Sequence, residues 1–483
     1  MPDMPTGGGI SPRWIAFRAS AVTTKIFRTN PPGKEVICPV PYYGIEYLRR
    51  KLRSKQFRVR LRYRFYEQKN LLQDFGISTP PRLRDWQTAL PWCTKAVDTL
   101  AKRLRFRGFR DDFFALDEIY RLNNRDLIFR SAIQSALIAA CSFIYISEDA
   151  TGYPRLQILD GRSATGILDP ITNLLSEGYA VLDWYDPARL AYGMSGVGGS
   201  GGLAGSGGVW PEWENSTFAD SAVPPFREAY FTAGYTYLYE NGRYTGTAYP
   251  NSAPYPLLVP IIFQPDASRP FGHSRISRAC MDLVGEAMRT LKRAEISAEF
   301  YSFPQKYFLG LENGVEFPDK WAATMSSMIT VTKAEDGTIP KAGQFSQGSM
   351  TPHAEQLKMI AGQFAAAADL TLDDMGFPTD NPSSAEAIKS AHENLRLAAV
   401  DAQQTFGTGF LNAGYLAACV RDRFAYTRQQ LSLEQPVWEP VFTPDAAMLA
   451  GIGDAVGKIN TAVPGYFGQD NLRDLTGIEG ESV

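Results

Sequence analysis

The residues whose types and spacing best suit a chemical role lie in one basic stretch, LRRKLRSKQFRVRLRYRF, at 48–65. It holds nine Lys or Arg residues and no acid, although the whole chain has a net charge of only −2. A run of cations without acids suits phosphate binding, whereas the usual role of such a run is a solvated helix face. The sequence leaves both roles open. The candidate phosphate contacts are Arg58, Arg60, Arg62 and Arg64.

No other set of residues has the spacing of a catalytic or metal site. The G-x-G-x-x-G and G-x-S-x-G matches around Ser200 fall in a glycine-rich tract, without the flanking strand and helix that these motifs need. The segment GDAVGKI at 453–459 lacks the glycine spacing and the final Ser or Thr of a P-loop. The three histidines are scattered: His273, His353 and His392. We therefore expect no enzyme, no metal and no cofactor.

Composition describes an ordered intracellular protein. The 483 residues are 44% hydrophobic and 12% aromatic, which is typical of a folded chain of two to four domains. The five cysteines are odd in number, far apart and without C-x-x-C spacing, which argues against disulfides and a zinc ribbon. No apolar run approaches the roughly 20 residues of a membrane span, and the N-terminus lacks a signal peptide.

The elements that would position the basic stretch change in type along the chain. Residues 1–40 predict a mobile arm and 193–208, with nine glycines in sixteen, a flexible insertion. Helical periodicity covers 92–104 and 118–140, and strand pairs are expected at 141–160 and 230–246. Residues 57–65 alternate as a strand would, but Leu48, Leu52 and Val59 follow helical spacing, so we expect a helix throughout 48–65.

The C-terminal half predicts three long helices around a small module. The first helix spans 274–300 with Ser274 as N-cap, and the second spans 351–370 with Thr351 as cap and Pro352 in its first turn. Strand-like pieces at 301–349 separate them. After a loop at 371–382, a third helix begins with the capping box Ser383 and Glu386. Its apolar side holds Ile388, Leu395, Ala399, Ala402 and Phe406.

Four segments, in this order, resemble bacteriophage portal proteins of the group that includes the portal of phage SPP1 and its actinobacteriophage relatives. They are WCTKAVDTLAKRLRFRGF (92–109), VPIIFQPDASRPFGHSRI (259–276), FPQKYFLG (303–310) and NPSSAEAIKSAHENL (381–395). Lys306 in the third segment stands where the family usually has Arg. Together the segments span most of residues 41–430, and four motifs in the family's order are hard to produce by chance.

The resemblance implies an α+β portal fold that forms a ring of twelve copies. The expected divisions are an arm at 1–40, a wing at 41–271, a stem helix at 272–300, a clip at 301–349, a second stem helix at 350–370, a tunnel loop at 371–382, a long helix and return to the wing at 383–442, and a crown at 443–483. The implied partners are double-stranded DNA, major capsid and scaffolding proteins, the large terminase and a neck adaptor. The expected location is the portal vertex of the virion, after assembly in the host cytoplasm.

The resemblance also assigns roles to individual residues. Residues 366–405 carry seven acids and two basic residues, which suits a channel that DNA must not stick to. The expected tunnel-loop residues are Asp373, Asp374, Met375, Phe377, Thr379, Asp380 and Asn381, with Lys389 in intermittent phosphate contact. The expected partner-docking residues of the clip are Lys306, Trp321, Lys333 and Lys341. The resemblance also places the basic stretch in the wing, where its four candidate arginines could face packaged DNA, capsid protein or acidic patches on an adjacent subunit.

Two other functions stay open at this stage. One is a neck or baseplate protein without a DNA channel, which would lack paired stem helices around a clip. The other is a hydrolase that binds sugars through a Tyr- and Trp-rich region and uses a carboxylate pair. The aromatic residues of that region are Trp184, Trp210, Trp213, Tyr235, Tyr237 and Tyr239.

Overall fold

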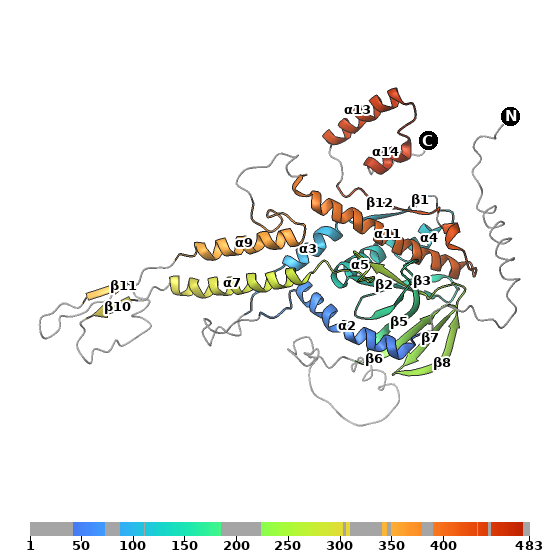
Figure 1. The fold of residues 1–483 in the computed structure, drawn as a ribbon, viewed down its shortest axis with the longest axis horizontal. Helices are drawn as coiled ribbons and strands as arrows, with labels where there is room; N and C mark the ends of the chain where they lie inside the picture. The colour runs from blue at the N-terminus through green and yellow to red at the C-terminus, as the bar shows by residue number, and fades with distance from the viewer. Residues whose placement is uncertain are drawn as a thin grey trace. The chain divides into compact units, whose positions relative to one another are not determined.

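The computed structural model describes most of the chain, which separates into two compact units (Figure 1). The described residues are 42–72, 87–110, 112–184, 224–302, 306–309, 341–344, 349–378, 390–431, 433–442 and 446–476. The first unit comprises Met1–Tyr63, Asp98–Arg275 and Ala399–Val483, and the second comprises Arg64–Val97 and Ile276–Ala398. The mixed helix-and-sheet class is confirmed. The expected arm at 1–40 and the glycine-rich insertion at 193–208 lie outside the described residues.

A five-stranded antiparallel sheet forms one part of the first unit. Its strands follow chain order, β4-β5-β6-β7-β8. Their bounds are Ala164–Leu168, Leu175–Trp184, Pro225–Thr232, Tyr235–Glu240 and Arg243–Pro250. The hairpin expected at 230–246 is confirmed as β7 and β8, joined at Asn241 and Gly242, both of which have positive φ (49° and 75°). An Asn-Gly pair adopts this conformation readily and matches the twist of the two strands.

A three-stranded sheet, ordered β3-β2-β9, also belongs to the first unit. The strands are β2 (Cys141–Glu148), β3 (Pro154–Leu159) and β9 (Leu258–Ile262), and helix α5 (Arg125–Ala139) packs against them. The strand pair expected at 141–160 is thus confirmed. The single helix expected over 118–140 is wrong, because it breaks into α4 (Leu116–Leu122) and α5. Asn124 adopts the left-handed conformation, and the Asn123 amide donates to the Ile119 carbonyl, which together end α4.

Helix α2 (Ile45–Tyr66) confirms the helix expected over the basic stretch and excludes the strand alternative. Its buried side chains follow helical spacing: Leu48, Leu52, Gln56, Val59 and Tyr63. Leu48 and Leu52 pack on Tyr179 and Val181 of β5. One face of the five-stranded sheet therefore holds α2 in place, and local alternation between residues 57 and 65 is overridden by this packing.

Two strands of the first unit that lie far apart in the sequence pair with each other. Strand β1 (Phe106–Arg110) pairs antiparallel with β12 (Gln435–Trp438). The ring centroid of Phe106 on β1 lies 4.4 Å from that of Phe129 on α5 and 4.9 Å from that of Trp438 on β12. The C-terminal elements are α11 (Glu393–Arg421), α12 (Arg428–Leu431), α13 (Ala446–Ala462) and α14 (Gln469–Thr476). Helix α11 crosses the boundary between the units, as do α2 and α3 (Trp92–Ala101).

The second unit is built on two helices packed side by side, α7 (Arg278–Ser302) and α9 (Thr351–Ala367) (Figure 1). Between them in sequence, β10 (Lys306–Leu309) pairs antiparallel with β11 (Lys341–Gln344). The ring of Trp92, at the start of α3, lies 5.4 Å from Phe364 on α9. The helix–module–helix order expected from sequence is therefore present, while its assignment as stem and clip stays a prediction.

Two expected helix caps are wrong, and a third lies outside the described residues. Ser274 is buried and donates its hydroxyl to the Ile138 carbonyl at 2.6 Å, so α7 starts later and Ser277 accepts from the Cys280 amide instead. Thr351 is the first helical residue of α9 rather than its cap, which is Met350. The capping box Ser383 and Glu386 lies outside the described residues. The predicted apolar residues of α11 that are described are all buried: Leu395, Ala399, Ala402 and Phe406.

Candidate functional site

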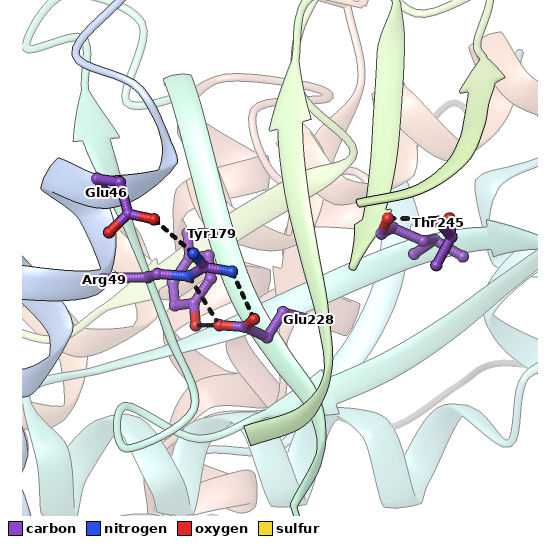
Figure 2. A network of polar contacts seen from close by, with 6 residues as sticks. Glu46, Arg49, Tyr179, Glu228 and Thr245 are labelled. Atoms are coloured by element: carbon purple, nitrogen blue, oxygen red, sulfur yellow. Dashed lines mark hydrogen bonds and ion pairs between the residues drawn. The ribbon is translucent and has the colours of Figure 1, made fainter. Parts of the chain in front are cut away.

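The positive charges of α2 divide into those used inside the molecule and those facing solvent. Arg49 belongs to the first group (Figure 2). Its guanidinium makes two hydrogen bonds to Glu228, Nε to Oε1 at 3.0 Å and Nη2 to Oε2 at 2.6 Å, and Nη1 reaches Glu46 at 2.5 Å. Glu228 lies on β6, is 1% exposed and also accepts from the Tyr179 hydroxyl. This charge therefore neutralises a buried carboxylate and is not available to a partner.

A second buried carboxylate holds the start of α2. Glu177 on β5 is buried and accepts hydrogen bonds from the backbone amides of Tyr43 and Gly44 and from the Tyr230 hydroxyl. A negative charge is favourable there because the first turn of a helix presents unpaired N–H groups and the positive end of its dipole. Neither Glu177 nor Glu228 was identified from sequence. Their only signal is an acid at a core-facing position of a β-strand.

Lys51 and Arg62 are also committed to internal contacts. The Lys51 ammonium donates to the Gly166 carbonyl at 2.7 Å, and burial, followed by the charge of Lys55, lowers the pKa of Lys51. Arg62 donates to the Ala139 carbonyl at 3.3 Å, at the C-terminus of α5. A cation is favoured at that end of a helix. Burial, followed by the charge of Arg58, lowers the pKa of Arg62.

The four arginines expected to act together do not share a face. Arg58 is exposed, whereas Arg60, Arg62 and Arg64 are only partly exposed. Residues two apart point about 200° apart on a helix, so alternate positions that would line one side of a strand are dispersed around α2. Their contact with DNA or capsid protein stays a prediction.

The described part of the acidic loop, 371–378, is a compact turn. Asp374 Oδ2 accepts from the Thr371 amide at 3.2 Å and from its hydroxyl at 3.0 Å, and lies 3.7 Å from His392 Nδ1. Met375 is buried and Phe377 is half-buried, but Asp373 is exposed. Of the tunnel-loop residues named from sequence, the last three and the nearby lysine lie outside the described residues: Thr379, Asp380, Asn381 and Lys389.

The predicted docking residues of the clip are only partly described. Lys306 lies on β10 opposite Gln344, and Lys341 on β11 lies opposite Leu309 and is exposed. Trp321 and Lys333 lie outside the described residues. The hairpin therefore carries a lysine at each of two diagonal corners, and their docking role stays a prediction.

A carboxyl group buried beside α4 has a strongly raised pKa. Glu434 is 2% exposed, its Oε1 accepts from the Phe114 amide at 3.1 Å, and its Oε2 has no hydrogen-bond partner. Burial raises the pKa of Glu434 to about 8, and the charges of Asp112 and Asp117 add to the increase. Asp112 itself accepts from the first amides of α4. No described group of three or more His, Cys, Asp or Glu residues is arranged to hold a metal ion.

We expect Glu434→Gln to stabilise the protein increasingly as the pH rises. In the wild type this carboxyl stays neutral in the folded state up to about pH 8 but ionises in the unfolded chain above about pH 4.5. Folding stability therefore falls between these two values, because the unfolded state has released the proton that the folded state keeps. The neutral amide removes this fall. The variant should match the wild type at pH 4 and exceed it by about 2–3 kcal/mol at pH 6.5.

Urea unfolding at several pH values measures this difference. Glu439→Gln is the control, since Glu439 is a more exposed carboxylate whose pair with Arg105 is 3.6 Å long, and we expect a change below about 0.5 kcal/mol. A constant difference between the Glu434 variant and the wild type across this pH range would contradict the prediction.

No described helix combines the length and the apolar character required to cross a lipid bilayer.

Two curated proteins are similar to the chain over most of its length. Both are named portal protein, from Mycobacterium phage L5 and Mycobacterium phage D29. Each is 23% identical, over 432 and 431 residues, covering 85% of this chain and 80% of the relative. No protein-family model matches. The resemblance to phage portal proteins indicated by the four sequence motifs is thereby confirmed.

The solved structures that are similar come from gene transfer agent particles. One is described as the virion of the native particle (13% identity, TM-score 0.43, 87% of this chain and 99% of that chain). Another is the neck of the native particle computed with C12 symmetry (14% identity, TM-score 0.43, 84% and 94%). A third is the neck of the empty particle computed with C6 symmetry (14% identity, TM-score 0.42, 83% and 93%).

Proposed function

We propose that this chain is the subunit of a phage portal, a ring that sits at one capsid vertex and conducts double-stranded DNA during packaging and ejection. The observation that carries the proposal is the similarity to two curated portal proteins across 85% of this chain and 80% of each relative. Twelve copies would form the ring. The ring would contact capsid and scaffolding proteins, dock the large terminase and later hold a neck adaptor.

The arrangement of the second unit supports this proposal. Helices α7 and α9 pack together, and the β10–β11 hairpin lies between them in sequence. In a portal subunit these would be the two stem helices and the clip. The acidic turn at 371–378 and the long helix α11 follow, as a tunnel loop and its helix would. A neck or baseplate protein would lack such a pair of helices around a clip.

The charges of this segment suit a conduit better than a binding site. Each phosphate that a protein neutralises adds affinity through counterion release, so a channel lined with cations would retain DNA. Asp373 is exposed on the turn, and Glu393 on α11 is held by Arg396 at 2.7 Å. We propose that the acidic loop lines the narrowest part of the channel and repels the duplex. The chain would then act without catalysing a reaction.

The sugar-binding alternative gains no support from the described aromatic region. The rings of Tyr237 and Tyr239 on β7 lie tilted against Tyr244 on β8, with centroids 6.1 and 5.5 Å apart. Two acids lie on the paired strands β6 and β7: Glu228, opposite Tyr239, is bonded to Arg49, and Glu240 pairs with Arg227. Each has a structural partner, so they do not form the free carboxylate pair that glycoside hydrolysis requires.

Negative-stain imaging of the purified full-length protein tests the proposal. We expect closed rings with a central hole and twelve-fold rotational averages. A monodisperse monomer at micromolar concentration, or rings without a hole, would contradict it. Lys341→Glu is a useful companion variant, since a charge reversal on an exposed hairpin residue should leave rings intact while weakening terminase or neck docking.

A further inference from the structure

Helix α2 presents a solvent-facing surface of arginines and aromatic side chains, which we call the outer α2 face. Its members are Tyr47, Arg50, Arg53, Phe57 and Arg58 of α2, together with Tyr43 just before the helix starts. The exposed fractions are 54% for Tyr43, 45% for Tyr47 and 73% for Phe57, and the three arginines are exposed as well. The rings of Tyr43 and Tyr47 stack at 4.8 Å. This surface lies opposite the buried side of α2 that packs on the sheet.

Helix geometry places these charges close together. At 100° per residue, Arg50, Arg53 and Arg58 fall within an arc of roughly 140° and span about 12 Å along the axis. Phe57 and Tyr47 lie inside the same arc. Arg49 and Arg62 lie outside this arc. Arg49 is bonded to Glu228, and Arg62 donates to the Ala139 carbonyl at the end of α5.

Among the described residues, no carboxylate pairs with the arginines of the outer α2 face; Glu46, which lies in the same arc and is 67% exposed, pairs with Arg49 instead. From Tyr47 to Tyr66 the helix contains no Asp or Glu, and the preceding acid, Glu46, is bonded to Arg49. Arg50, Arg53 and Arg58 have no carboxylate within ion-pair distance among the described residues. Their positive charge is therefore available to a partner from outside the chain.

A surface with a single sign of charge fits the regular charge of a nucleic acid better than a protein. Protein interfaces bury few unmatched charges and position them against specific carboxylates. A DNA duplex offers a phosphate every few ångströms, so several flexible arginines can each gain a contact. Tyrosine hydroxyls are also common donors to phosphate oxygens. The aromatic residues at the start of the face can thus contribute beside the arginines.

We propose that the outer α2 face binds the phosphate backbone of duplex DNA without reading its sequence. The inference depends on the proposed function in one respect, namely that the protein meets duplex DNA. It differs from the expectation drawn from sequence in its residues: Arg58 remains, Arg50 and Arg53 are added, and Arg62 is assigned to the fold. The face would retain DNA, in contrast to the acidic loop, which would let it slide.

Fluorescence anisotropy with two unrelated 24-base-pair duplexes tests this inference on the full-length protein. Titrations from 50 to 200 mM KCl give the slope of log affinity against log salt. We expect the triple variant R50Q/R53Q/R58Q to lose about tenfold or more in affinity at 50 mM, and its slope to fall by about 2.7, or 0.9 for each lost phosphate contact. Both duplexes should respond alike.

The matched control removes the same charge from other exposed positions of the first unit. Arg130, Arg155 and Arg243 lie on α5, β3 and β8 and are exposed, so R130Q/R155Q/R243Q should keep the wild-type affinity and slope. The variant R50K/R53K/R58K should bind DNA as the wild type does, since it keeps the three positive charges. That variant also keeps the test decisive if the glutamine triple does not fold.

Several outcomes would overturn the inference. One is an equal loss of duplex affinity in the two triple glutamine variants. Another is unchanged duplex affinity in R50Q/R53Q/R58Q, and a third is no duplex binding by the wild type at 50 mM KCl. The last result, combined with loss of capsid assembly in the α2 triple, would assign the face to an acidic protein instead. Ring formation by each variant, seen by negative stain, separates this inference from the proposed function. Intact rings with unchanged DNA binding overturn only the inference, and absent rings with normal DNA binding overturn only the portal proposal.

Discussion

Gly272→Ala is expected to destabilise the protein by about 4 kcal/mol or more, enough to prevent accumulation of folded chain. Gly272 has φ +76°, and a Cβ added there would lie 2.0 Å from the carbonyl oxygen of Phe263. That oxygen accepts the His273 amide at 2.9 Å and so closes the loop from 263 to 273. The left-handed conformation costs a non-glycine residue about 1–3 kcal/mol, and forcing backbone atoms apart adds a similar amount.

Gly234→Ala is the matched control for this prediction. Gly234 also has positive φ (+86°), in the turn between β6 and β7, but nothing lies within 4 Å of its Cβ position. It should therefore show only the conformational effect, about 1 kcal/mol. Urea unfolding followed by tryptophan fluorescence, with soluble yield as a second readout, compares the two variants. Equal losses would show that the contact with Phe263 does not matter.

Arg49→Met is expected to destabilise the protein by about 3–4 kcal/mol, the second largest effect. The substitution keeps the apolar part of the side chain but leaves Glu228, which is 1% exposed, without its cation. Breaking a buried ion pair by removing one partner is strongly unfavourable because the remaining charge stays out of water. We also expect α2 to loosen from the sheet, since the two hydrogen bonds from Arg49 to Glu228 join these elements.

A double-mutant cycle separates the ion pair from general disruption. The double variant R49M/E228Q should be less destabilised than the sum of R49M and E228Q, because it leaves no unpaired charge. Arg227→Met is the comparison variant, at the residue next to Glu228 on β6. Its pair with Glu240 is 3.4 Å long and roughly half-exposed on both sides, so its loss should be below about 1 kcal/mol. Strict additivity in the cycle would contradict the interpretation.

Much of the local structure was predictable because it depends on near neighbours in sequence. The Asn241–Gly242 turn, the strands at 141–160 and the helices around 92–101 and 351–367 were all expected at their places. The break between α4 and α5 was not expected. The apolar spacing continues through Asn123 and Asn124, and only contacts such as that from the Leu156 amide to the Asn123 side chain show why the helix stops there.

The candidate site was less predictable than the elements that carry it. The sequence identified the basic stretch but assigned Arg62 to a possible DNA or capsid contact, because the C-terminus of α5 that it reaches lies far away in the chain. The buried carboxyl groups Glu177, Glu228 and Glu434 were missed for the same reason. An acid is recognised as structural only when its partners are visible, and each of these three has a partner more than 100 residues away.

By itself the sequence determined the type of most elements, the resemblance to phage portal proteins and the excess of positive charge at 48–65. The element types and the charge excess follow from periodicity, turn chemistry and composition, and the resemblance rests on four motifs; all are properties of short segments. Only the tertiary structure decided which of those charges are free. Arg49 and Arg50 are adjacent and chemically identical, yet one neutralises Glu228 and the other faces solvent. The reason is that helix phase and sheet packing, rather than residue type, determine which side chains are buried.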